Sequence, residues 1–156
     1  MILTDDGKRQ RYDATGEIDD GADMRRAQAL ELVGQMLGEF LGDDNAIYRN
    51  LVEEMKRGLG SQIRQLTDKA AQQRRAIDKA EKIRGRFKAK KGQDIIGQMI
   101  EAQIAGARNG LSQIDARIEV VRAAVDIVGN AEFSVEPMPS YARGTASSFI
   151  YTRTGA

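Results

Sequence analysis

Two long stripes of apolar residues occupy the middle of the chain, with a polar turn between them. From Leu59 in the first stripe and Ile100 in the second, the positions follow one another in steps of four and three. This period is typical of a helix that packs along one narrow seam, as in a coiled coil. The stripes are Ile47, Leu51, Met55, Leu59, Ile63, Leu66, Ala70, Gln73, Ile77, Ala80, Arg84, Phe87, and Ile96, Ile100, Ile104, Ala107, Leu111, Ile114, Ile118, Val121, Val125, Val128.

The turn between the stripes covers residues 90–94, Lys-Lys-Gly-Gln-Asp. Lysines suit the negative end of a helix dipole, and Gly92 supplies a permissive backbone. Asp94 is a good N-cap for the helix that follows. We therefore predict one helix over about 46–90 and a second over about 95–128.

A short loop between two helices with matching stripes requires antiparallel packing. Placing Phe87 opposite Ile96 brings Val128 opposite Met55. The first helix then outruns the second at its start. The apolar side chains before Met55 need another cover, either an earlier helix of the same chain or another subunit.

Four residues of the first predicted long helix are unfavourable for a continuous apolar seam. Gly58 and Gly60 are weak helix formers and could kink or break the helix. Gln73 and Arg84 are polar residues at seam positions, which lower stability but can fix the register of two helices. An alternative seam through Ile83 would relieve Arg84.

A shorter amphipathic helix is predicted over 23–41, with Asp23 as its cap. Gly42 suits a left-handed residue at the end of this helix. Asp44 or Asn45 then caps the long helix that follows.

Both ends of the chain differ from the helical middle. Residues 1–22 are polar and rich in Gly and Asp, which predicts an irregular arm. Residues 130–156 predict a second, extended arm. Residues that favour strands recur in it and could pair with each other or with a partner's sheet edge, at Phe133 and Val135 and then at Phe149, Ile150 and Tyr151.

Together these elements predict an all-α fold. Its main part is a long antiparallel, coiled-coil-like hairpin over 45–129, preceded by the short helix over 23–41. Arms over 1–22 and 130–156 extend from this unit.

The amino-acid composition excludes several kinds of functional site. The 156 residues include no Cys and no His, which excludes disulfides, thiol nucleophiles and imidazole ligands. No apolar run approaches the ~20 residues of a membrane span, and the first residues lack the pattern of a secretory signal. We expect an intracellular protein or one carried within an assembled particle.

The sharpest local feature is a cluster of cations around the turn. Residues 74–91 hold nine bases against two acids. This pattern is typical of a solvated helix end, and it also suits contact with phosphate or an anionic surface. The candidate contact residues are Lys82, Arg84, Arg86, Lys88, Lys90 and Lys91.

Acidic pairs predict no site. Asp19-Asp20 and Asp43-Asp44 lack the alternating ligands of a calcium loop, and Glu53-Glu54 flanks a helix stripe as surface charge. The sequence contains no Walker A pattern. We therefore predict no catalytic, cofactor-binding or metal-binding residues.

The predicted shape favours a structural role. A two-helix seam buries little, while ordering the chain costs on the order of 1.5 kcal/mol per residue. We therefore expect a homo-oligomer or partner subunits. The first hypothesis is a non-enzymatic assembly protein in a larger particle, specifically a bacteriophage virion component such as a head–tail connector, tail or internal protein. The alternative is a nucleic-acid-binding or regulatory module that uses the basic residues of 82–91.

Overall fold

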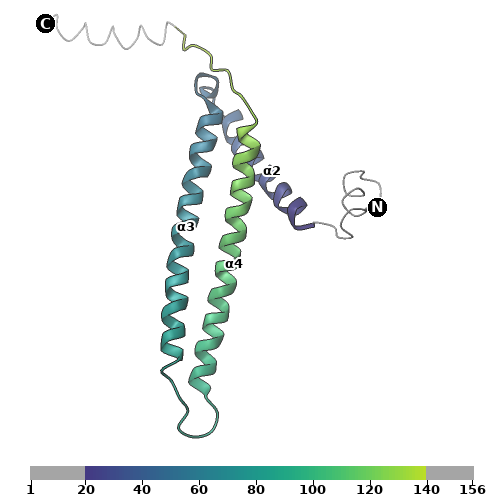
Figure 1. The fold of residues 1–156 in the computed structure, drawn as a ribbon. Helices are drawn as coiled ribbons and strands as arrows, with labels where there is room; N and C mark the ends of the chain where they lie inside the picture. The colour runs from purple at the N-terminus through teal and green to yellow at the C-terminus, as the bar shows by residue number, and fades with distance from the viewer. Residues whose placement is uncertain (1–19, 140–156) are drawn as a thin grey trace, which may run out of the picture.

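The computed structural model describes residues 20–139 and is all-helical over that range. Three α-helices follow one another, α2 (Asp20–Leu41), α3 (Leu51–Arg84) and α4 (Ile95–Gly129). A short 3₁₀ turn, η2 (Ala46–Tyr48), lies between α2 and α3. This arrangement confirms the predicted fold class for the described part of the chain (Figure 1).

Helices α3 and α4 lie side by side and antiparallel, joined by a loop over 85–94 (Figure 1). Side chains link the two helices along their length. Gln73 donates from Nε2 to the carbonyl oxygen of Ala107 at 3.2 Å, and Arg74 pairs with Asp115 at 3.1 Å. The predicted antiparallel hairpin is therefore present (Figure 1).

Helix α2 covers the start of α3 and the end of α4. Its buried residues join one hydrophobic cluster with side chains of both long helices. Leu51 and Val52, before Met55, are thus buried by the same chain, whereas Ile47 remains 44% exposed. The buried members of this cluster are Ala29, Leu32, Val33, Val52, Met55, Leu59, Val120, Val121, Ala124 and Val128.

The start of α3 differs from the prediction. The helix begins at Leu51, and Asn50 is its cap, accepting from the backbone N–H of Glu53 at 3.2 Å. Asn45 precedes only η2 and makes no side-chain cap bond there. Asp43, which precedes η2, makes local contacts. Its carboxylate accepts from the backbone N–H of Asn45 and pairs with Arg49.

The structure shows the backbone conformation at three glycines for which the sequence raised a question. Gly42 is not left-handed, since Gly92, with φ of 69°, is the one described residue with positive φ. No break occurs at Gly58 or Gly60, and α3 is continuous through both.

The predicted end of the first long helix is also wrong. Helix α3 stops at Arg84, so the last six predicted residues lie in the loop. The predicted seam pair Phe87 and Ile96 is exposed, because the two backbones separate beyond Arg84. Helix α4, by contrast, starts at Ile95 and ends one residue past the predicted end.

The described residues next to the two predicted arms differ in part from the prediction. Helix α2 begins at Asp20, so Asp23 lies inside its first turn instead of capping it. Residues 130–139 contain no strand, and Phe133 packs against the hydrophobic cluster. The backbone N–H of Glu136 donates to the carbonyl oxygen of Ile47 at 2.9 Å, which holds this segment against η2.

Candidate functional site

Arg84 closes the loop end of the hairpin. Its Nη2 lies 2.9 Å from Oδ2 of Asp94, and its Nε lies 2.9 Å from Oε1 of Glu101. Asp94 also caps α4, because its Oδ1 accepts from the backbone N–H of Gly97 at 3.1 Å. A Cβ at Gly97 would overlap both Arg84 and Asp94, so the missing side chain makes room for the ion pair.

The hydrogen bond to Glu101 raises the pKa of Arg84 above its already high usual value, and the charges of Asp94 and Glu101 raise it further. Like any arginine in a protein, this guanidinium is charged, and its N–H groups are directed to Asp94 and Glu101. Of the predicted contact residues, Arg84 has a role in holding the hairpin end together.

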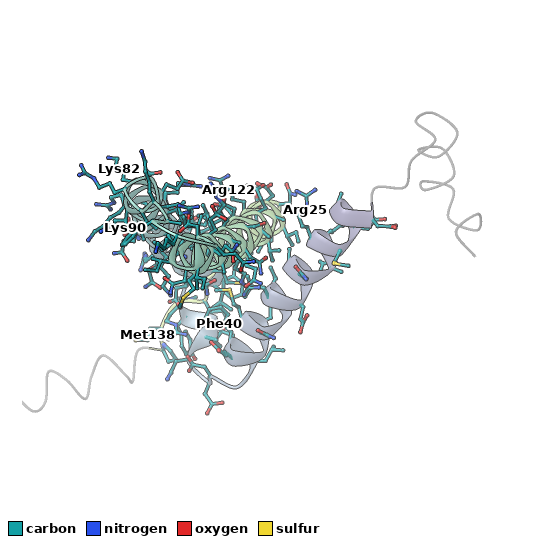
Figure 2. All side chains as sticks on the ribbon, turned by 90° about the horizontal axis from the view of Figure 1, so that it is seen from below. Arg25, Phe40, Lys82, Lys90, Arg122 and Met138 are labelled. Carbon is teal, nitrogen blue, oxygen red and sulfur yellow. The ribbon has the colours of Figure 1, made fainter. Side chains whose placement is uncertain are left out.

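The other five predicted cations surround this anchor. Lys82 lies in the last turn of α3, and the rest lie in the loop. All are exposed, and none forms an ion pair with the described residues. Figure 2 shows Lys82 and Lys90 at the outer edge of this end of the hairpin. We call this set the basic tip: Lys82, Arg86, Lys88, Lys90 and Lys91.

Large apolar side chains are exposed among these cations. Their exposed fractions run from 42% to 61%. This group was not predicted from the sequence, because Phe87 and Ile96 continue the two apolar stripes and were expected in the seam. The available signal was the off-seam pair Ile95 and Met99, one turn apart at the start of a helix. We call this set the apolar tip: Ile83, Phe87, Ile95, Ile96 and Met99.

Helix α2 has a second apolar face besides the one it buries. Its residues follow one another in steps of three and four, and all of them are exposed. Leu41 is 88% exposed. No described atom beyond α2 itself lies within 4 Å of the Cβ position of Gly34. We call this set the outer face of α2: Ala27, Leu30, Gly34, Leu37 and Leu41.

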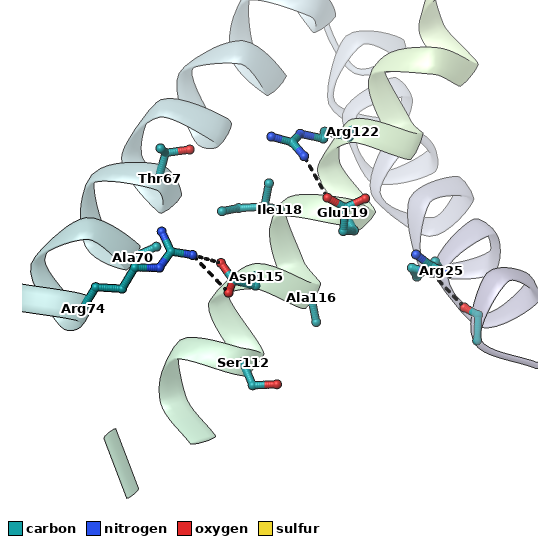
Figure 3. Close-up of a pocket in the computed structure, with 11 residues that line it drawn as sticks. Arg25, Thr67, Ala70, Arg74, Ser112, Asp115, Ala116, Ile118, Glu119 and Arg122 are labelled. Atoms are coloured by element: carbon teal, nitrogen blue, oxygen red, sulfur yellow. Dashed lines mark hydrogen bonds and ion pairs between the residues drawn. The ribbon is translucent and has the colours of Figure 1, made fainter. Parts of the chain in front are cut away.

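An open groove lies between α2 and the hairpin (Figure 3). Its three arginines all have acceptors. Arg74 pairs with Asp115 at 3.1 Å, Arg122 pairs with Glu119 at 2.8 Å, and Nε of Arg25 donates to the carbonyl oxygen of Gly21. The three arginines of the groove therefore already have hydrogen-bond or ion-pair partners. Asp115 and Glu119, the carboxylates among its described lining residues, are each paired with an arginine.

The predicted strand contact residues Phe149, Ile150 and Tyr151 lie outside the described residues. Within residues 20–139, no helix has the length and apolar character to cross a membrane. Comparison with protein-family models, curated proteins and solved structures gives no match.

Proposed function

We propose that this protein is a structural subunit that self-associates through the outer face of α2 and serves in a larger assembly. The observation that supports this proposal is the pair of apolar faces on one helix. One face, including Ala29, Leu32 and Val33, is buried against the hairpin, and the outer face is exposed to solvent.

The occupant we propose for the outer face is α2 of a second copy. The steps of three and four along Ala27, Leu30, Gly34, Leu37 and Leu41 are those of a helix–helix seam. Gly34 and Ala27 have little or no side chain, which lets a second helix backbone approach closely. A symmetric contact between identical faces closes without leaving an edge, as in most homodimers.

Further exposed apolar side chains extend this surface at the end of α2. Ile47 lies on η2, and Val135 lies on the segment that donates to the Ile47 carbonyl oxygen. A contact that covers Leu37, Leu41 and Ile47 together would remove a continuous apolar area from water, which is the main source of association free energy.

The hairpin supplies the rigid part of the proposed subunit. We infer that its seam packs as a coiled coil over the stretch where the steps of four and three are strict. A rod of this kind separates two surfaces, with the outer face of α2 near one end and the loop 85–94 at the other (Figure 1).

The test is the mass of the full chain in solution by size-exclusion chromatography with light scattering. We expect a species larger than one chain for the natural protein. Leu30→Asp with Leu37→Asp places two charges in the proposed contact, and we expect this variant to be monomeric with unchanged helical circular dichroism.

The matched control is Ile95→Asp with Met99→Asp, which changes two exposed apolar residues on α4 at the opposite end of the hairpin. This control should keep the mass of the natural protein. A natural protein that is monomeric at all concentrations tested would refute the proposal. An α2 variant that keeps the larger mass would refute the assigned face.

A further inference from the structure

We infer that the loop end of the hairpin is a docking site for the surface of an anionic lipid bilayer. The basic tip and the apolar tip both lie at the loop end of the hairpin, away from α2 (Figure 1), and their side chains are exposed. Phosphate-bearing lipid headgroups would meet the cations, and the apolar side chains would enter the boundary between headgroups and acyl chains.

Charge complementarity identifies an anionic partner. Residues 82–99 contain six bases and one acid, a balance of +5, whereas the whole chain has a formal charge of +1. The single acid, Asp94, is paired with Arg84, so the carboxylate does not neutralise the basic tip. Basic residues close to an anionic membrane each strengthen attachment by about fivefold in affinity.

The apolar tip distinguishes a bilayer from other anionic partners. Ile95, Ile96 and Met99 on α4 and Phe87 in the loop expose apolar surface at the same end of the hairpin as the lysines. A nucleic-acid backbone offers phosphates but no apolar phase for such side chains. A bilayer offers both, and peripheral proteins attach by combining apolar insertion with attraction to anionic headgroups.

The loop suits this role mechanically. Lysine side chains can lay their methylene stems along apolar surface while the ammonium groups reach the headgroups. The Arg84–Asp94 and Arg84–Glu101 pairs hold the two helix ends behind the loop together. The apolar and basic side chains are thereby presented on a fixed base, so less order must be gained on binding.

The test is co-sedimentation of the full chain with vesicles of phosphatidylcholine mixed with phosphatidylserine, compared with vesicles of phosphatidylcholine alone. We expect binding to the mixed vesicles that weakens as salt is raised, and little binding to the neutral ones. Lys88→Glu, Lys90→Glu and Lys91→Glu together should lower the affinity for mixed vesicles by about a hundredfold or more.

The matched charge control reverses Arg57, Arg64 and Lys69, which are exposed cations of α3 without ion pairs to described residues. The control changes net charge by the same amount and should keep most of the binding. If it reduces binding as much as the triple change in the loop, attraction depends on total charge and the assigned site is wrong.

A second pair of variants tests the apolar contribution. Ile95→Ser with Met99→Ser should weaken binding to mixed vesicles by roughly tenfold. Met24→Ser with Met138→Ser removes exposed apolar residues outside the loop end and should leave binding unchanged. Unchanged binding of Ile95→Ser with Met99→Ser would show that apolar insertion plays no part and would overturn the inference.

Nucleic acid provides the competing outcome. The same proteins are titrated with duplex DNA at low salt in a mobility-shift assay. Retardation of DNA that depends on Lys88, Lys90 and Lys91, combined with no binding to mixed vesicles, would replace the bilayer with a nucleic-acid partner. Circular dichroism of every variant checks that the helices are intact.

Discussion

Arg84 at the end of α3 and Asp94 before α4 form an ion pair across the hairpin loop, with Nη2 and Oδ2 2.9 Å apart. Asp94 has a second role, because its other oxygen caps α4. The loop is therefore fixed at both ends by one carboxylate. Gly97, buried one turn into α4, leaves the space in which the two side chains meet.

Gly97→Ala should disrupt this arrangement. The new Cβ would overlap the Arg84 guanidinium and the Asp94 carboxylate, so one of them must move. We expect a loss of about 1–3 kcal/mol in the free energy of unfolding, as for other overpacked sites. Urea denaturation measures the change. Gly106→Ala is the control, because its Cβ position lies in open space on the same helix. It should gain roughly 1 kcal/mol from helix propensity, and equal gains in both variants would contradict the expectation.

The hydrophobic cluster where the three helices meet should dominate stability. Leu59 is fully buried there, among the buried residues of α2 and α4. Leu59→Ala should lower the free energy of unfolding by about 2–5 kcal/mol through lost burial and a cavity. Leu41→Ala, at a site 88% exposed, should change it by no more than about 0.5 kcal/mol. Chemical denaturation of the two variants at low protein concentration makes the comparison, and similar losses would show that Leu59 is not in a packed core.

The hairpin could be predicted because its signal is periodic and long. Between Leu59 and Ile77 the apolar positions keep one register, and α4 repeats it from Ile100 to Val128. A single misjudged residue does not change such a pattern. Both helices were therefore found, and the pairing of Met55 with Val128 agrees with their shared cluster.

Helix ends depend on choices that the sequence alone does not decide. Asp44, Asn45 and Asn50 are all good caps, and the structure uses Asn50 for the long helix. Local ion pairs accompany this choice. Arg49 pairs with Asp43 and Glu54, which brings the residues before the helix into a turn.

The apolar tip was missed for a similar reason. A stripe of apolar residues indicates which side of a helix faces a partner, but not where the partner ends. Phe87 and Ile96 continue the two stripes, yet they lie beyond the last close approach of α3 and α4. The apolar tip therefore became apparent only once the position of Arg84 was known.

The continuity of α3 through its two glycines gives a further prediction. Gly60 lies in the helix with no atom outside its own helix backbone within 4 Å of its Cβ position. Gly60→Ala should raise the free energy of unfolding by about 0.5–1 kcal/mol, because alanine loses less backbone entropy in a helix. Thermal unfolding followed by circular dichroism measures the gain. A loss of stability would mean that the helix bends or opens at this position, as the sequence had suggested.

Gln73 gives the last prediction, which concerns the polar position in the seam. Its Nε2 donates to the carbonyl oxygen of Ala107, inside α4, where helical bonding already satisfies that oxygen. The hydrogen bond is therefore supplementary, while an apolar side chain at the same place would complete the stripe. Gln73→Leu should raise the free energy of unfolding by about 1 kcal/mol. A Cβ built on Gly110 would lie 3.8 Å from Nε2, so the missing side chain leaves room for the leucine.

Gln73→Glu is the matched variant of nearly equal size. Its carboxylate cannot donate a hydrogen bond and would face the Ala107 carbonyl oxygen, so this variant should be less stable than the natural protein. Urea denaturation of the three proteins should show that Gln73→Leu is the most stable, the natural protein is intermediate and Gln73→Glu is the least stable. If leucine proved less stable than glutamine, the hydrogen bond would outweigh apolar burial, and Gln73 would be a determinant of stability as well as of helix register.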